Sequence, residues 1–130
     1  MPYLKKVLQR IERNGAPVIV FARDADHSLN ALSKIGADVL SISWAADLAL
    51  AKERVNGRVA LQGNLDPCAL LSTEATVRQE TINVLEKYGE GEGHIFNLGH
   101  GILPSTPVAN AQTLVQCVKE ESVRFHSGMT

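Results

Sequence analysis

A histidine between two glycines, Gly99-His100-Gly101, is the group best suited to ligand chemistry in this chain of 130 residues. The glycines leave the backbone free to bend and give the imidazole little side-chain cover. Such an imidazole can donate a hydrogen bond to a ligand carboxylate or carbonyl, or titrate near neutral pH. His100 is therefore a candidate ligand-binding residue, and a turn histidine that bonds to local backbone is the alternative. Asn97 is expected to hold the glycine loop by hydrogen bonds.

A second polar segment, Gly63-Asn64-Leu65-Asp66-Pro67, favours a structural role. Asn and Asp beside Gly and Pro form turns and cap the helix that follows. In the alternative interpretation, Gln62, Asn64 and Asp66 help to shape the mouth of a ligand pocket.

A charged cluster, Arg23-Asp24-Ala25-Asp26-His27, follows the first apolar run of the chain. Surface ion pairs among these side chains are the favoured interpretation, and the alternative is that Arg23 points into a pocket for an acidic ligand. Trp44, the only tryptophan, is interpreted as a residue of a pocket rim or of the core rather than as a stacking platform.

Metal and cofactor sites are not indicated. Cys68 and Cys117 lie far apart and, without an export signal, favour two small buried hydrophobic residues over a disulfide or a ligand cluster. His94 and His126 have no second ligand at a useful spacing. The Gly91-x-Gly93 pair precedes an apolar run, whereas a dinucleotide-binding loop follows a strand and opens a helix. We therefore expect neither a metal ion nor an organic cofactor.

Short apolar, β-branched runs alternate with amphipathic stretches along the chain. Apolar residues at i, i+3, i+4 and i+7 predict helices, and continuous apolar runs predict strands buried on both faces. The helices are expected at 2–13, 27–35, 46–55, 73–88 and 107–124, and the strands at 17–22, 37–44, 59–62 and 94–98. The last helix carries one apolar face formed by Val108, Ala111, Leu114, Val115 and Val118. This order predicts a parallel sheet with right-handed crossovers.

Two architectures fit this α/β order: a doubly wound sheet of flavodoxin type, or half of a (β/α)8 barrel. In both, the polar segments follow the carboxyl ends of strands, where such folds bind ligands. A half-barrel has two open edges and an uncovered inner face, and we expect both to promote self-association.

The composition is that of a globular domain, with 45% hydrophobic and 21% charged residues. The net charge of −1 and the scattered basic residues argue against nucleic-acid binding. No apolar run approaches the roughly 20 residues that span a bilayer, and the N-terminal residues carry no secretory pattern. We expect a cytoplasmic protein that binds neither nucleic acid nor membrane.

Three segments match motifs of a known family. Val59–Pro67 (VALQGNLDP) resembles the LQGN(L/M)DP stretch of uroporphyrinogen decarboxylases, and Phe96–Ile102 (FNLGHGI) resembles their C-terminal NLGHG(I/L) motif. Pro17–Asp24 resembles a strand of the same enzymes, and order and spacing agree over nearly the whole chain. Two departures stand out: Ser43 replaces the usual Asp before Trp, and Arg23 replaces the common Lys, which changes the donor geometry.

The resemblance implies an α/β fold in which residues 1–130 are the C-terminal half, the last four βα units, of a (β/α)8 TIM barrel. The family is a carboxy-lyase of porphyrin and haem biosynthesis, typically a homodimer, without metal or organic cofactor. It removes the four acetate carboxyl groups of uroporphyrinogen III and gives coproporphyrinogen III.

Only the family's motif histidine among its substrate-binding residues has a position here, and it is His100. No catalytic residue is assigned, and the chain by itself is expected to be inactive. The residues expected to shape the pocket are Arg23, Gln62, Asn64, Asp66, Asn97, Gly99 and Gly101.

Three hypotheses follow. The first is a fragment of this decarboxylase, which acts on a tetrapyrrole in the full enzyme. The second is a stand-alone half-barrel, a binding or assembly module that forms a homo-oligomer or associates with the missing half-barrel. The third is a fragment of a corrinoid-linked methyltransferase of the same superfamily. Those enzymes hold zinc on His and Cys ligands, for which this sequence offers no plausible set.

Overall fold

Four short parallel strands form the centre of the computed structural model, which describes residues 2–126. They lie in the order β1-β2-β3-β4, and each is parallel to its neighbour. Their bounds are β1 Ile19–Phe21, β2 Val39–Ser41, β3 Ala60–Gln62 and β4 His94–Ile95. The helices are α1 Pro2–Arg10, α2 Leu29–Leu32, α3 Leu48–Val55, α4 Glu74–Tyr88, α5 Val108–Glu121 and α6 Val123–His126, with short 3-10 helices η1 Asp26–Ser28 and η2 Pro67–Leu71. The predicted alternation of strands and helices around a parallel sheet is confirmed.

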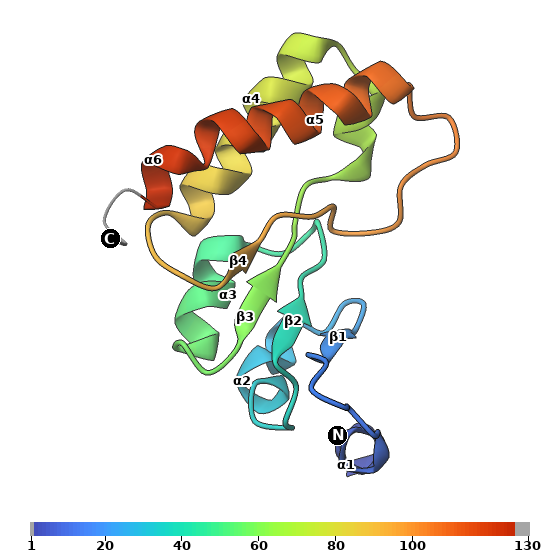
Figure 1. The fold of residues 1–130 in the computed structure, drawn as a ribbon, viewed down its shortest axis with the longest axis vertical. Helices are drawn as coiled ribbons and strands as arrows, with labels where there is room; N and C mark the ends of the chain where they lie inside the picture. Colours follow the sequence, from blue (N-terminus) through green and yellow to red (C-terminus); the bar gives the residue numbers. More distant parts are fainter. Residues whose placement is uncertain (1, 127–130) are drawn as a thin grey trace.

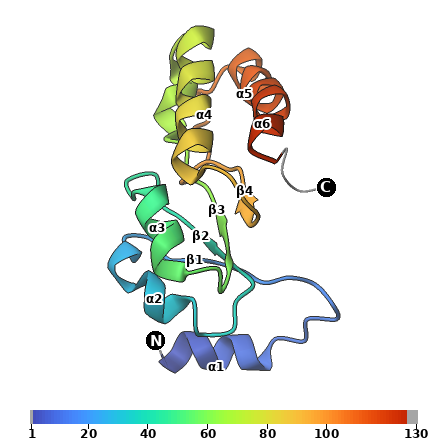
Figure 2. The ribbon, with the colours of Figure 1, turned by 90° about the vertical axis from the view of Figure 1, so that its left-hand side faces the viewer.

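The helices are distributed unevenly around the sheet (Figure 1). Helices α2 and α3 lie on one face, while α4 and α5 lie side by side beyond the carboxyl ends of the strands (Figure 2). Helix α1 lies beyond the amino ends of the strands in both views. No helix of residues 2–126 covers the opposite face, so one face of the sheet is packed and the other is open.

The register of the strands decides which side chains reach each face, because successive residues of a strand point to opposite sides. The row that faces the helices consists of the paired residues Val20, Leu40, Leu61 and His94. Its apolar members are buried, with Leu40 2% and Leu61 1% exposed. This row is the sheet's contribution to the hydrophobic core.

The next row along the strands faces the open side, and we call it the inner row. It consists of Phe21, Ser41, Gln62 and Ile95. Phe21 is 47% and Ile95 41% exposed, although both are large apolar residues of a β-sheet. The inner row is therefore an apolar and polar surface that no described element covers.

Side chains next to helices α3 and α4, which precede and follow β3 in the chain, set where these helices begin. The Asp47 carboxylate accepts a hydrogen bond from Leu50 N at 3.0 Å and begins α3, which ends where Asn56 adopts a φ of 48°. The Thr73 hydroxyl accepts from Thr76 N at 3.2 Å and begins α4. These are N-caps of the usual residue types.

Helix α5 packs against α4 around Cys117, one of the two cysteines that the sequence predicts to be buried. Cys117 is its fully buried residue, and the Arg78 and Glu120 side chains form an ion pair at 2.6 Å beside it. Val108 and Val115, expected on the apolar face, are 72% and 52% exposed. Leu114, on the same predicted apolar face, packs against the core, so this face is covered in part and exposed at Val108 and Val115.

Several predicted elements are shorter than expected. The strand expected at 37–44 spans only Val39–Ser41, and the one expected at 94–98 spans only His94–Ile95, because the chain beyond each bends into a loop. The helix expected at 27–35 is reduced to η1 and α2. Cys68, expected to be buried, is exposed, whereas Cys117 is buried, and both thiols are free.

We expect Leu61→Ala to lower the free energy of unfolding by about 2–5 kcal/mol, because it leaves a cavity in the middle of the core. Leu50→Ala, at a side chain that is 42% exposed on α3, is the matched control and should cost less than about 1 kcal/mol. Urea denaturation followed by circular dichroism measures both. Equal losses in the two variants would contradict the assignment of the helix-facing row to the core.

Candidate functional site

The loop that follows β3 is joined to the loop that follows β2 by a buried amide. Asn64 is 6% exposed, and its Nδ2 donates hydrogen bonds to Ser43 O at 2.9 Å and to Ala46 O at 2.8 Å. Two backbone carbonyls therefore occupy both hydrogens of this amide. The structure gives Asn64 a cross-linking role between loops at the carboxyl end of the sheet.

The loops after β3 and β4 continue to pair beyond the strands. Gly63 N donates to Ile95 O at 3.0 Å, Leu65 N to Asn97 O at 3.1 Å and Gly99 N to Leu65 O at 2.8 Å. These bonds carry the parallel ladder past the assigned strand ends and direct the β4 loop across the top of β3. Gly99 is thereby brought towards β2.

Gly99 touches the backbone of Trp44 so closely that only glycine fits. A Cβ at this position would lie 2.2 Å from Trp44 N and 2.5 Å from Trp44 Cα. With glycine in place, Trp44 N donates to Gly99 O at 3.2 Å. Trp44 itself is 50% exposed, as expected of a rim residue, and its backbone fixes the β4 loop.

His100 follows this contact and lies over the far side of the sheet. Its side chain is exposed, and its ring meets Phe21 of β1 edge-on, with 6.2 Å between centroids and an interplanar angle of 81°. Because β1 and β4 are the two edges of the sheet, the glycine loop crosses from one edge to the other. The imidazole thus lies at the carboxyl end of the strands next to the inner row.

The remaining predicted site residues are held in local contacts. In the inner row, Gln62 Nε2 donates to Ser41 Oγ at 3.3 Å. The Asp66 carboxylate accepts from Cys68 N at 2.9 Å and caps η2. Asn97 accepts from Leu98 N through its side-chain oxygen at 2.8 Å, so it braces the loop that leads to the glycines.

Arg23 lies on the surface. Its Nε is 3.4 Å from Asp24 Oδ2, and the two side chains are 72% and 77% exposed. The geometry agrees with the interpretation of a surface ion pair. At this exposure such a pair contributes little stability.

Sequence reasoning missed the role of His94. Its Nε2 lies 2.7 Å from Gly63 O, and its ring stacks on Tyr88 with centroids 4.3 Å apart. A carbonyl can only accept, so Nε2 carries the proton of the neutral ring. The signal was available in the alternation of β4, which puts His94 in the same row as the core residues Leu40 and Leu61.

Burial lowers the pKa of His94 below its ordinary value of 6.5. The hydrogen bond to Gly63 acts in the opposite direction, while the charges of His126 and Lys52 lower the pKa further. Lys52 lies 4.2 Å from the centroid of the Tyr88 ring and donates to Tyr88 O at 2.8 Å. This group of side chains supports the start of the β3 loop.

Residues 2–126 offer neither a cluster of metal ligands nor a helix that could span a membrane. No three His, Cys, Asp or Glu side chains in this range come together as a set that could hold a metal ion. Among the described helices, none combines the length and the apolar character needed to cross a membrane.

Parallel strands followed by helices, with an exposed imidazole at the carboxyl end of the sheet, define an α/β protein with its candidate site on the loops that follow its strands. The family model "Uroporphyrinogen decarboxylase (URO-D)" matches residues 1–121, so the chain belongs to the uroporphyrinogen decarboxylase family. The family resemblance noted in the sequence is therefore confirmed.

Named relatives agree with this assignment. A uroporphyrinogen decarboxylase of Legionella pneumophila (strain Corby) is 42% identical over 128 residues, which cover 97% of this chain and 36% of the relative. The enzyme of Chloroherpeton thalassium is 44% identical over 131 residues, covering 97% of this chain and 37% of the relative. The chain thus spans little more than a third of the length of these relatives.

A solved structure has the same fold. A methyltransferase from Methanosarcina mazei superposes with a TM-score of 0.76 at 22% identity, covering 92% of this chain and 34% of its own. At this identity the likeness bears on the fold alone.

We expect Gly99→Ala to destabilise the chain and to displace the β4 loop, because the added methyl group overlaps the Trp44 backbone. Gly101→Ala is the matched control, since a Cβ there meets nothing within 4 Å. Trp44 is the only tryptophan, so its fluorescence reports on the contact directly. A Gly99→Ala chain with the emission spectrum and unfolding midpoint of the Gly101→Ala chain would contradict the role of Gly99.

The lowered pKa of His94 predicts a pH-dependent stability. As pH falls below about 6.5, the unfolded chain binds a proton before the folded chain does, so the free energy of unfolding decreases with falling pH. His94→Gln, which does not titrate, should reduce this slope between pH 7 and the lower folded pKa. Urea denaturation at a series of pH values measures the slope, and an unchanged slope in the variant would contradict the prediction.

Proposed function

We propose that this chain forms the part of a uroporphyrinogen decarboxylase that carries the motif histidine, as the last four βα units of a (β/α)8 barrel. The observation that carries the proposal is the place of His100, an exposed imidazole at the carboxyl end of a parallel sheet in a chain of this family. Since the chain spans 36% of the Legionella relative, the proposed enzyme needs further βα units from elsewhere.

The proposed substrate is uroporphyrinogen III, a tetrapyrrole whose side chains end in carboxylates. His100 can donate a hydrogen bond to one of these carboxylates, and such charge-assisted bonds are stronger than neutral ones. Its edge-on contact with Phe21 supports the ring. Below it, the inner row offers apolar groups to a macrocycle face through Phe21 and Ile95, and polar groups through Ser41 and Gln62.

The reaction needs more groups than His100 supplies. Loss of CO2 from a pyrrole acetate requires protonation of the pyrrole ring, which then accepts the electron pair of the breaking C–C bond. It also requires stabilisation of the resulting cation and return of a proton to the new methyl carbon. Several substrate carboxylates need cationic partners in addition. We therefore propose that the chain alone does not turn over substrate.

The finer parts of the proposal follow the family resemblance. They are carboxy-lyase chemistry without metal or organic cofactor, a cytoplasmic location, and a homo-oligomer or a complex with a complementary half-barrel. A corrinoid-linked methyltransferase has less support, because the likeness to the Methanosarcina enzyme concerns the fold alone. Zinc chemistry of that kind would also need a His and Cys ligand set, which is not assembled within residues 2–126.

A chimaeric enzyme tests the proposed function. Residues 1–130 replace the 128-residue matching segment of the Legionella pneumophila relative, and conversion of uroporphyrinogen III to coproporphyrinogen III is measured. We expect the chimaera to be active and the isolated chain to be inactive. A folded but inactive chimaera would count against the function, and turnover by the isolated chain would refute the claim that its site is incomplete.

Within the chimaera, His100→Ala should lower kcat/KM by roughly 10- to 100-fold, the value of one hydrogen bond to a charged group. His27→Ala, at another exposed histidine in η1, is the matched control and should leave kcat/KM unchanged. Equal losses in both variants would remove His100 from the proposed substrate site.

A further inference from the structure

Both edges of the sheet lack a neighbouring strand within residues 2–126. In a parallel strand, alternate residues direct their backbone groups to opposite neighbours. On β4 the carbonyls of Gly93, Ile95 and Asn97 accept hydrogen bonds from β3 and its loop, so His94 and Phe96 direct theirs outward. On β1, Val18 O accepts hydrogen bonds from β2. By the same alternation, the backbone N–H and C=O groups of Ile19 and Phe21 point away from β2.

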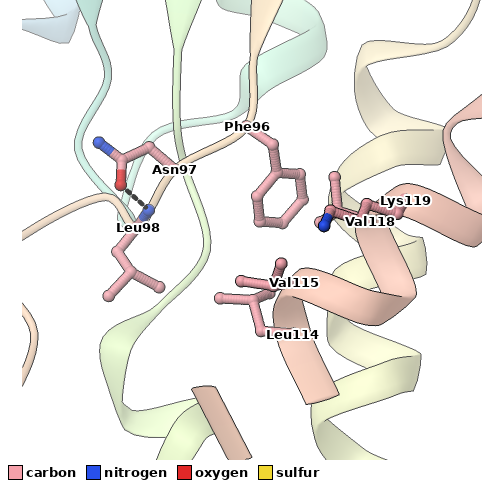
Figure 3. A pocket seen from close by; sticks show the side chains of 7 residues that line it. All are labelled: Phe96, Asn97, Leu98, Leu114, Val115, Val118 and Lys119. Carbon is pink, nitrogen blue, oxygen red and sulfur yellow. Dashed lines mark hydrogen bonds between the residues drawn. The ribbon is translucent and has the colours of Figure 1, made fainter. Parts of the chain in front are cut away.

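An apolar groove lies directly outside the β4 edge (Figure 3). It has a volume of about 340 Å³ and runs between the chain after β4 and one side of α5. Its apolar walls are Phe96, Leu98, Leu114, Val115 and Val118. Figure 3 shows the Phe96 ring turned towards α5, with the Asn97 side chain bonded to Leu98 N on the other side. The groove is therefore suited to the apolar side chains of an added strand.

The β1 edge of the sheet is also open and carries exposed apolar side chains. Ile19 is 46% and Phe21 47% exposed, and helix α1 lies beyond the amino ends of the strands, where it leaves this edge open (Figure 2). An open parallel edge with exposed apolar residues is a template for another strand. The two edge strands of the sheet, β1 and β4, therefore both carry apolar residues, and they run in the same direction.

The charges near the two edges are complementary. The loop before β4 carries the exposed Glu90 and Glu92, whereas α1, at the amino ends of the strands, carries Lys5, Lys6 and Arg10. If β4 of one copy lies parallel to β1 of another, the amino ends of both strands meet. The acidic loop then lies near the basic helix, and opposite charges favour this orientation over an antiparallel one.

We propose that a second copy of this chain docks its β1 edge, in parallel, against the β4 edge beside the groove at α5. A two-fold axis repeats the junction on the other side, so that two copies close one eight-stranded barrel. At eight strands a barrel interior is just wide enough to be filled by side chains, and the inner rows of both copies supply them. The inference rests on the edges and their charges and is independent of the decarboxylase assignment.

Sedimentation velocity of the purified chain across a dilution series tests the proposal. The expected species is a dimer. Val115→Glu in the groove and Ile19→Glu on β1 should each raise the dissociation constant by roughly 100-fold or more, because each charge lies in both junctions. Leu50→Glu, at a similarly exposed residue of α3, is the matched control and should leave the dimer intact. Far-UV circular dichroism checks that each variant is folded.

Mixing the two edge variants adds a test of geometry. A heterodimer of the Val115→Glu and Ile19→Glu chains keeps one unmodified junction, so the mixture should associate more strongly than either variant alone. The proposal is overturned by a monomeric wild-type chain, which would leave the edges to a different polypeptide. It is also overturned by open-ended larger assemblies, by a dimer that neither edge variant weakens, or by a mixture that gains no affinity.

Discussion

The close approach of Gly99 to the Trp44 backbone is the constraint on which the loops at the carboxyl end of the sheet depend. A side chain at residue 99 would overlap the backbone nitrogen of Trp44 at 2.2 Å, whereas glycine allows the carbonyl to accept its hydrogen bond. Through this contact the β4 loop crosses the ends of β3 and β2 and brings His100 to Phe21 on the far edge. His100, the proposed ligand-binding residue, therefore reaches this position because the preceding residue is glycine.

Several polar side chains of β4 and of the loops after β2 and β3 hold the backbone of these loops. Asn64 bonds two carbonyls of the β2 loop, Asp66 caps η2 and His94 binds the carbonyl of Gly63. Such bonds satisfy groups that would be costly to bury unpaired. These polar side chains are therefore used in hydrogen bonds to the backbone, whereas the imidazole of His100 stays exposed.

The open face of the sheet links the proposed function to the proposed assembly. The inner row lies below His100 and is also the surface that would form a barrel interior. Exposed large apolar residues such as Phe21 and Ile95 tend to be covered in solution. Association at the two edges would therefore enclose the proposed ligand surface and the apolar side chains in one step.

The sequence by itself determined the α/β order, the family and the candidate His100, because these depend on periodicity and motifs. It could not determine the shortness of the strands, since strand ends depend on where loops bend to meet other loops. It also could not determine how far the apolar face of α5 is covered, because this depends on packing: Leu114 lies against the core, whereas Val108 and Val115 are exposed. Only the tertiary structure paired Gly99 with Trp44 and His94 with Gly63. These contacts join residues from 31 to 55 positions apart, and local sequence carries no signal for such distances.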